Sequence, residues 1–204
     1  MLSLYTQNTP NGLKVNILLE ELGLAYTQQK LSFSANEQKQ PWFLDINPNG
    51  RIPAIVDHTN NDLAVFESGA ILWYLAERAR RFIPLGGDEK IQALQWLMFQ
   101  MSGIGPMKGQ AHHFILYAPV DIAYGKTRYR DETKRLYGVL ETQLQRKPYI
   151  NGEYSIVDMA TWPWINGSER IGIDLNEWPK LAAWVNTIAQ RPAVIRAQAR
   201  LAAD

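Results

Sequence analysis

The sequence predicts an α/β domain followed by an all-helical domain, and three observations support this fold class. Short strand-like and helix-like runs alternate over the first part of the chain, whereas strand signals nearly vanish beyond residue 88. Residues 82–88 contain one proline and two glycines, a composition typical of a linker. A hydrophobic content of 46% over 204 residues is ample for packed cores. The expected domains are therefore residues 1–82 and residues 88–204.

The first domain is expected to alternate strands and helices. Apolar residues recur at helical spacing from Leu13 to Leu22, and Gly23 is a natural C-terminal stop. Turn-forming side chains at residues 59–62 indicate a hairpin. The expected strands are residues 3–5, 25–31, 54–57 and 63–66, and the expected helices are residues 13–22 and 69–81. This β-α-β, connector, β-β-α order, with a right-handed first crossover, is thioredoxin-like and places ligands near the ends of the central strands.

The second domain is expected to be helical throughout. Gly103, Gly105 and Pro106 should bend or break its first helix. Ser155 and Asp158 match a capping box and precede an apolar run. The expected helices are residues 91–99, 123–144, the run from 159 to 165, then 179–188 and 193–203.

The composition excludes several classes of function. Because the chain has no cysteine, it has no disulfide scaffold, thiolate zinc site or cysteine nucleophile. A net charge of +1 provides no whole-chain attraction to nucleic acid or to an anionic membrane. No apolar run approaches the roughly 18 residues of a membrane span, and residues 1–5 do not resemble a signal peptide. A soluble cytoplasmic protein is the expectation.

Two neighbouring segments, residues 47–56 and 66–71, are the most informative part of the sequence. The first is a turn-rich loop leading into a short apolar strand, and Pro53 opens that strand without a ladder donor. The second ends a strand at Glu67 and Ser68 and then begins an apolar helix. Such a helix start brings backbone N–H groups, a hydroxyl and a carboxylate together. The two segments therefore describe a small site for a peptide backbone and an α-amino-acid end.

The turn after the first expected strand carries a second group of polar side chains. Thr9 and Asn11 place a hydroxyl and an amide at the start of a helix, where both could donate to a ligand sulfur. A thiol surrounded by donors has a lower pKa and is more nucleophilic at neutral pH. The alternative is that both residues only form the turn and cap the helix. The residues alone leave both interpretations open.

Several stretches of the sequence are specific enough to indicate a family. They are residues 9–12 (Thr-Pro-Asn-Gly), residues 66–71 (Phe-Glu-Ser-Gly-Ala-Ile), residues 105–110 with 112–114, and Arg128-Tyr129. Together they resemble the cytosolic glutathione transferases, in particular the nu-class glutathione-dependent disulfide-bond oxidoreductases of bacteria, nearly end to end. The resemblance implies a thioredoxin-like α/β N-terminal domain plus an all-α C-terminal domain, a homodimer, and glutathione as cosubstrate without a metal.

The resemblance also assigns roles to individual residues. It places Thr9 and Asn11 at the sulfur-contacting positions and implies a cis bond between Ile52 and Pro53, which frees the Ile52 backbone to pair with an extended tripeptide. The glutathione-binding residues expected on these grounds are Gln38, Arg51, Ile52, Pro53, Glu67, Ser68 and Arg128.

Individual residues of this set have different alternatives. Ser68 and Glu67 suit the carboxylate and the ammonium of the γ-glutamyl end, but they could also form a plain helix cap. Arg51 departs slightly from a family that often has lysine there. Arg51 and Gln38 could be solvated loop residues, and Arg128 could pair with Glu132 on its own helix.

Three other residues are weaker candidates. Tyr5 is a rival for the sulfur role, but its place inside a strand favours core packing. The adjacent His112 and His113 are not expected to share a metal, because neighbouring helical residues point about 100° apart.

The expected function is glutathione-dependent disulfide reduction. Because the chain has no cysteine, the redox sulfur must belong to bound glutathione. One alternative is conjugation, in which the same thiolate attacks a small electrophile. A second alternative, from a different class, is a non-catalytic glutathione-binding or regulatory module.

Overall fold

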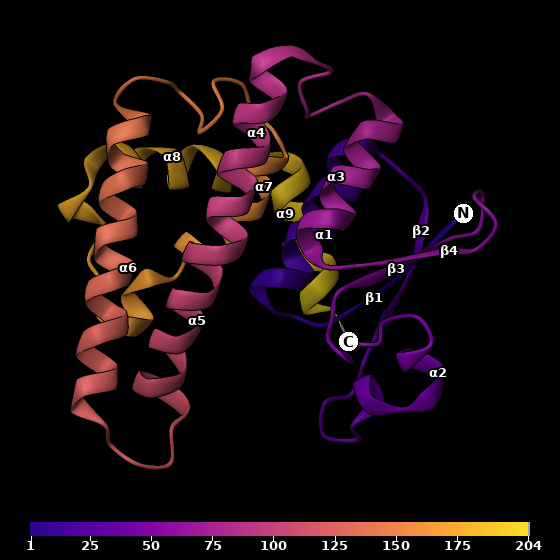
Figure 1. Ribbon diagram of the computed structural model, residues 1–204, viewed down its shortest axis with the longest axis horizontal. Coiled ribbons are helices and arrows are strands. Elements are labelled where there is room, and N and C mark those ends of the chain that lie inside the picture. The colour runs from indigo at the N-terminus through magenta and orange to yellow at the C-terminus, as the bar shows by residue number, and fades with distance from the viewer. Residues whose placement is uncertain (204) are drawn as a thin grey trace. The chain divides into compact units, whose positions relative to one another are not determined.

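The chain divides by its internal contacts into two compact units (Figure 1). The computed structural model describes residues 1–203. Unit 1 comprises Met1–Ile83 together with residues 191–203, and unit 2 comprises Pro84–Gln190.

Unit 1 is built on a four-stranded mixed sheet with the order β2-β1-β3-β4. The β1–β2 pair is parallel, as the crossover helix between them requires, and the other two pairs are antiparallel. The hairpin register pairs Ala54 with Phe66 and Asp57 with Leu63. The strands are β1 (Leu2–Thr6), β2 (Tyr26–Lys30), β3 (Ala54–Asp57) and β4 (Leu63–Phe66). The thioredoxin-like α/β prediction is confirmed.

The helices of unit 1 bury apolar side chains, and the one that α2 buries, Phe43, packs in a small cluster with Leu31 and Ala54. Gly23 ends α1 in the left-handed conformation (φ 66°), which a residue without Cβ adopts freely. Helix α1 packs against both α3 and α9 (Figure 1). The helices are α1 (Pro10–Leu22), α2 (Pro41–Leu44), α3 (Ser68–Ala79) and α9 (Pro192–Ala202), with a short turn at Glu37–Lys39.

The position of α9 differs from the domain division that the sequence suggested. Residues 191–203 were expected at the end of the helical domain, but their contacts place them with unit 1. Arg191 donates to both carboxylate oxygens of Glu21 through Nε and Nη2, and the Arg200 guanidinium lies 3.9 Å from the centre of the Tyr26 ring. These partners lie more than 160 residues away in sequence, so the local pattern does not show them.

Unit 2 is helical throughout, which confirms the prediction for this part of the chain. Its helices are α4 (Gly87–Phe99), α5 (Gly105–His112), α6 (Ala123–Leu144), α7 (Ile156–Ile165) and α8 (Pro179–Ala189), with turns at Ser168–Ile171 and Leu175–Glu177.

The first helix of unit 2 does not break at the expected place; its backbone instead widens locally into a π-helical turn. A π-helical turn at Gln100–Ile104 connects α4 directly to α5, and a second one at His113–Tyr117 follows α5. Pro106 closely follows the first of these π-helical turns, where the change in hydrogen-bonding pattern accommodates a residue without an amide N–H. The bend that the glycines and proline predicted is therefore absorbed without ending the helix.

The start of α7 is the predicted capping box. The Ser155 hydroxyl accepts from the Val157 N–H at 3.3 Å, and the Asp158 carboxylate accepts from the Ser155 N–H at 3.0 Å. The same carboxylate also accepts from the Ile150 N–H at 3.1 Å and from the Trp184 indole at 2.9 Å. Burial raises the pKa of Asp158 to about 6, and these hydrogen bonds oppose the rise. The group is therefore a carboxylate at neutral pH.

Within residues 1–203, none of the helices combines the length and the apolar character needed to cross a membrane.

Candidate functional site

The N-terminus of α1 carries Thr9 and Asn11. Thr9 is the N-cap, with extended backbone angles, and its hydroxyl oxygen accepts from the Gly12 N–H at 3.1 Å. The capping interpretation is thus confirmed for Thr9. It does not exclude the sulfur role, because capping uses the oxygen as acceptor and leaves the hydroxyl hydrogen to be donated. Both side chains are partly buried, at the positive end of the helix.

Gly12 holds this turn close to the end of β1. A Cβ atom at Gly12 would lie 2.3 Å from the Gln7 carbonyl oxygen and 2.5 Å from the Thr6 hydroxyl oxygen. Since the first contact is with backbone, no side-chain rotation relieves it. Glycine therefore fixes where Thr9 lies relative to β1.

Tyr5 packs as the strand position suggested. Its ring lies 5.9 Å from both the Trp42 and the Phe43 ring, beside a fully buried cluster that includes Leu31 and Ala54. Its aromatic contacts are those of a core side chain.

The loop before β3 contains the predicted proline. The Ile52–Pro53 peptide bond is cis, as expected. Asn47, which the sequence analysis did not single out, organises this loop: it is 2% exposed, its amide donates to the Arg51 carbonyl at 2.6 Å, and its oxygen accepts from the Asn49 N–H at 3.0 Å. Arg51 itself is exposed.

Gln38 is partly buried near the same loop. Its side-chain oxygen is enclosed and has no hydrogen-bond partner within residues 1–203. Its backbone oxygen lies 2.8 Å from the place of a Cβ on Gly50, which has a φ of 59°. An enclosed amide oxygen without a partner can accept from a ligand, so this geometry is compatible with the expected role.

The corner between β4 and α3 holds Glu67 and Ser68. Glu67 has φ 69° and ψ 117°, a region that non-glycine residues rarely occupy and that is found mostly at functional sites. Its side chain is exposed, whereas Ser68 is 3% exposed. The Ser68 hydroxyl oxygen accepts from the Lys14 ammonium at 3.2 Å.

Lys14 is the residue of this corner that the sequence analysis missed. It is 1% exposed on α1, and burial lowers its pKa to about 7 although the Glu67 carboxylate acts in the opposite direction. A signal was present in the sequence, because Lys14 interrupts the apolar stripe of residues 13–22. Through Lys14 the starts of α1 and α3 are joined.

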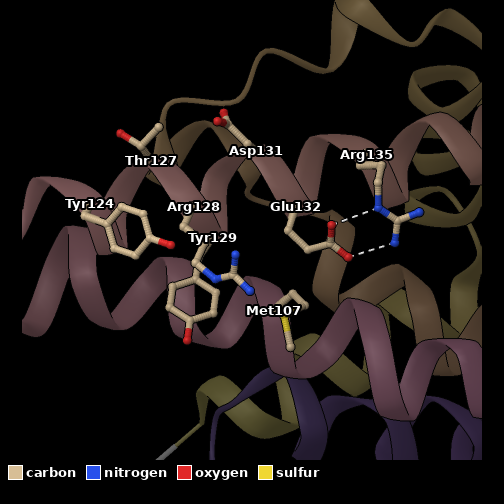
Figure 2. Close-up of a pocket in the computed structure, with 8 residues that line it drawn as sticks. All are labelled: Met107, Tyr124, Thr127, Arg128, Tyr129, Asp131, Glu132 and Arg135. Carbon is tan, nitrogen blue, oxygen red and sulfur yellow. Dashed lines mark hydrogen bonds and ion pairs between the residues drawn. The ribbon is translucent and has the colours of Figure 1, made fainter.

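Arg128 lies in unit 2, on α6. It lines a cavity of about 630 Å³ together with Met107, Tyr124, Thr127, Tyr129, Asp131, Glu132 and Arg135 (Figure 2). The alternative in which Arg128 pairs with Glu132 has partial support, because the Arg128 charge helps to lower the pKa of Glu132. Glu132 accepts two hydrogen bonds from Arg135, at 2.8 and 2.7 Å, and these bonds lower its pKa (Figure 2).

His112 and His113 have different surroundings. The His112 ring stacks on Trp164 at 6.4 Å, and burial lowers its pKa to about 4. His113 is exposed and meets Phe114 edge-on. A group of three histidine, aspartate or glutamate side chains that could hold a metal is not present among residues 1–203.

Comparison with known proteins identifies the family. Residues 2–77 match the glutathione S-transferase N-terminal domain, and residues 121–192 match the glutathione S-transferase C-terminal domain. The chain belongs to the glutathione S-transferase family. It is 47% identical over 198 residues to the disulfide-bond oxidoreductase YfcG of Escherichia coli K12, covering 95% of this chain and 92% of that protein. The predicted family resemblance is confirmed.

Two solved glutathione transferase structures are similar over almost the whole chain. The URE2P6 transferase of Phanerochaete chrysosporium, in complex with oxidised glutathione, is 40% identical with a TM-score of 0.93, and the match covers 98% of this chain and 96% of that one. A family member from Pseudomonas fluorescens Pf-5, with two glutathione molecules bound, is 42% identical with a TM-score of 0.91, covering 97% and 92%. The glutathione transferase fold is thereby established.

The predicted site residues of this chain fall into two groups. Thr9, Asn11, the Ile52–Pro53 bond and the Glu67–Ser68 corner all lie in unit 1, at or next to the ends of its strands. Gln38 and Arg51 belong to the same unit, whereas Arg128 belongs to unit 2. Asn47 and Lys14 complete the set in unit 1.

Proposed function

We propose that this transferase is a glutathione-dependent disulfide reductase that uses the thiol of bound glutathione. The observation that carries the proposal is the Thr9 cap: its oxygen is engaged by Gly12, so its hydroxyl can donate to a sulfur at the positive end of α1. The chain itself has no cysteine to serve as the redox group. The similarity to a disulfide-bond oxidoreductase supports the same reaction.

The reaction balances with two glutathione molecules. A glutathione thiolate, stabilised by Thr9 and Asn11, attacks one sulfur of the substrate disulfide; the S–S bond breaks, and the leaving thiolate takes up a proton. A second glutathione thiolate then attacks the mixed disulfide and releases the second substrate thiol. Glutathione disulfide is the oxidised product, and the substrate has gained two electrons. The relative with two bound glutathione molecules supports this stoichiometry.

The remaining site residues are proposed to hold the tripeptide. Ser68 and Glu67 bind the γ-glutamyl carboxylate and ammonium, and the Ile52 backbone beside Pro53 pairs with the extended chain. Gln38 and Arg51 lie toward the glycyl end. Arg128, on α6 of unit 2, is proposed as a further glutathione-binding residue on the grounds of the family resemblance.

Parallel assays separate this function from conjugation. Turnover should be measured with a small disulfide such as hydroxyethyl disulfide and with an aromatic halide, at the same glutathione concentration. A reductase is expected to turn over the disulfide far faster. Faster conjugation would replace the proposal with its first alternative, and absence of glutathione binding in calorimetry would favour the non-catalytic module.

Substitutions at the β4–α3 corner should weaken glutathione affinity more than they slow the chemistry. Ser68→Ala and Glu67→Gln remove hydrogen bonds to the remote γ-glutamyl end, which should be similar in the ground and transition states. Each such bond is worth about 1.5–3 kcal/mol, so the half-saturating glutathione concentration should rise about ten- to a hundredfold. Ser34→Ala, an exposed serine of the same unit, is the control. Lower turnover at saturating glutathione, with unchanged half-saturation, would contradict the assignment.

We also propose that the protein is a homodimer. Trp73 on α3 and Trp96 and Phe99 on α4 are aromatic side chains that are only partly buried. In addition, α4 exposes an apolar stripe at Ile91 and Met98, with exposed fractions of 59% and 48%. Light scattering at micromolar concentration should report twice the chain mass. Ile91→Glu with Met98→Glu should yield the monomer, and a monomeric wild type would contradict the prediction.

A further inference from the structure

Lys14 is a buried charged residue that the proposed chemistry leaves without a role. Its neighbours Val15 and Ile17 on α1 are fully buried and apolar. Lysine is almost never fully buried unless its charge is compensated, so the groups around its ammonium matter. The structure places Nζ 3.2 Å from the hydroxyl oxygen of Ser68, the first residue of α3. The ammonium of Lys14 on α1 therefore lies at the N-terminus of α3.

The direction of this hydrogen bond determines what the Ser68 hydroxyl can do. An ammonium has three hydrogens and no lone pair, so Lys14 donates and the Ser68 oxygen accepts. The hydroxyl hydrogen of Ser68 is then not used by Lys14, and a ligand carboxylate is an acceptor to which it could be donated. A neutral amine would have a lone pair and could accept that hydrogen itself, which would turn the hydroxyl away from a ligand.

Glu67 provides the opposite charge at the same corner. Its carboxylate raises the pKa of Lys14 against the larger effect of burial. This corner therefore carries two opposite charges, the exposed carboxylate of Glu67 and the buried ammonium of Lys14. Ser68 follows Glu67 in the chain and accepts a hydrogen bond from Lys14. An α-amino acid carries the complementary pair of charges on adjacent groups.

The other charged side chains on the helices packed around Lys14 act elsewhere. Arg78 on α3 pairs with Asp57, and Glu77 lies in the last turn of that helix. The contacts between α1 and α9 join Glu20 and Glu21 to Arg191, Arg196 and Arg200. Glu67 is a charged group that acts on Lys14.

We propose that Lys14 is a positioning residue for γ-glutamyl recognition: its ammonium holds the Ser68 hydroxyl as a hydrogen-bond donor toward the ligand's α-carboxylate. The inference rests on the proposed role of Ser68 and Glu67. Both charges of the γ-glutamyl end are then matched, the carboxylate by Lys14 acting through Ser68 and the ammonium by Glu67. A donor geometry fixed from inside the core needs no rearrangement when the ligand arrives.

Calorimetric titration with S-hexylglutathione tests this proposal, because this ligand has no thiol and so reports binding alone. Lys14→Met keeps the length of the side chain and removes the donor, and it should raise the Kd about tenfold or more. In the Ser68→Ala background the same substitution should have little further effect, because the two residues act through one hydrogen bond.

Lys108→Met is the matched control. Lys108 is also 1% exposed and donates to a serine hydroxyl, Ser168, at 3.0 Å, but it lies on α5 in unit 2. Its substitution should leave the Kd within about twofold of wild type, whatever it does to stability. A merely structural role for Lys14 predicts instead that both lysine variants lose stability and neither loses affinity.

Two further readouts distinguish positioning from packing. Wild-type affinity should fall as the pH rises through about 7, since the protonated Lys14 is the form that binds and its pKa lies there. Lys14→Met should lack this dependence. Because the folded state lowers the lysine pKa, the charged form costs stability below pH 7, so the melting temperature of Lys14→Met should equal or exceed that of wild type.

The possible outcomes separate this inference from the proposed function. If wild type binds and Lys14→Met binds equally well with the same pH dependence, the role of Lys14 is wrong and that of Ser68 stands. If wild type does not bind S-hexylglutathione, both are wrong. Should Lys14→Met not fold, Lys14→Leu replaces it, and a Kd for that variant within about twofold of wild type overturns the proposal.

Discussion

Replacing Asp158 with alanine should destabilise the protein strongly, and more than the loss of an exposed helix cap would. The carboxylate accepts from the Ile150 N–H, the Ser155 N–H and the Trp184 indole, all in the buried interior of unit 2. Each of these three donors left without a partner costs about 1–3 kcal/mol, so the free energy of unfolding should fall by at least about 3 kcal/mol. Urea unfolding followed by tryptophan fluorescence measures the change.

Asp174→Ala is the matched control for this substitution. Asp174 likewise accepts a backbone hydrogen bond at a helix start, from the Asn176 N–H at 2.9 Å, but it is an N-cap and its surroundings are exposed. Loss of an exposed cap costs about 1 kcal/mol. If Asp158→Ala loses no more than Asp174→Ala at the same protein concentration, the buried hydrogen bonds of Asp158 are not the source of its effect.

Asp158 also shows how far sequence reasoning extends. The Ser155–Asp158 box is local, and its spacing alone predicted the helix start. The bond from Trp184 spans 26 residues and depends on how α7 and α8 pack, so no local pattern contains it. The same distinction explains α9, whose periodicity was visible while its arginine contacts to α1 were not.

The same distinction between local patterns and contacts across elements applies to the candidate site. Residues in turns and at helix starts were found because turn and capping chemistry is local: Thr9, the Pro53 region and the Glu67–Ser68 corner belong to this class. Lys14 and Asn47 act across elements or from inside a loop, and their burial determines their roles. A single sequence shows the residue type at each position but not what the fold encloses.

Removing both polar side chains at the start of α1 should have the largest effect on activity. Thr9→Ala and Asn11→Ala should each lower disulfide reduction about ten- to a hundredfold, since each donor supplies about 1–3 kcal/mol of thiolate stabilisation. The double variant should lose less than the product of the two effects, because either donor or a water partly compensates for the other. Turnover at saturating glutathione and the ultraviolet absorbance of the bound thiolate are the measurements.

The cap that Thr9 provides must be separated from its proposed donor role. Thr9→Ala loses both the hydrogen bond from Gly12 and the hydroxyl hydrogen, whereas Thr9→Ser keeps both and should retain most of the activity. Asn8→Ala, an exposed neighbour in the same turn, should behave as wild type. If Thr9→Ala loses stability but keeps its turnover, the residue is a cap and nothing more.

The absence of cysteine makes the mechanism testable by mass as well as by rate. A protein–glutathione adduct requires a protein thiol, so turnover should proceed without one, and the oxidised species should be glutathione disulfide or its mixed disulfide with substrate. If both single variants keep their turnover within about twofold of wild type, under ~0.5 kcal/mol, the sulfur is stabilised by other groups. Tyr5 is the next residue to test, although its packing against Trp42 and Phe43 restricts how far its hydroxyl can move. The α1 N-terminus would then contribute only its helix dipole, which is worth less than a directed hydrogen bond.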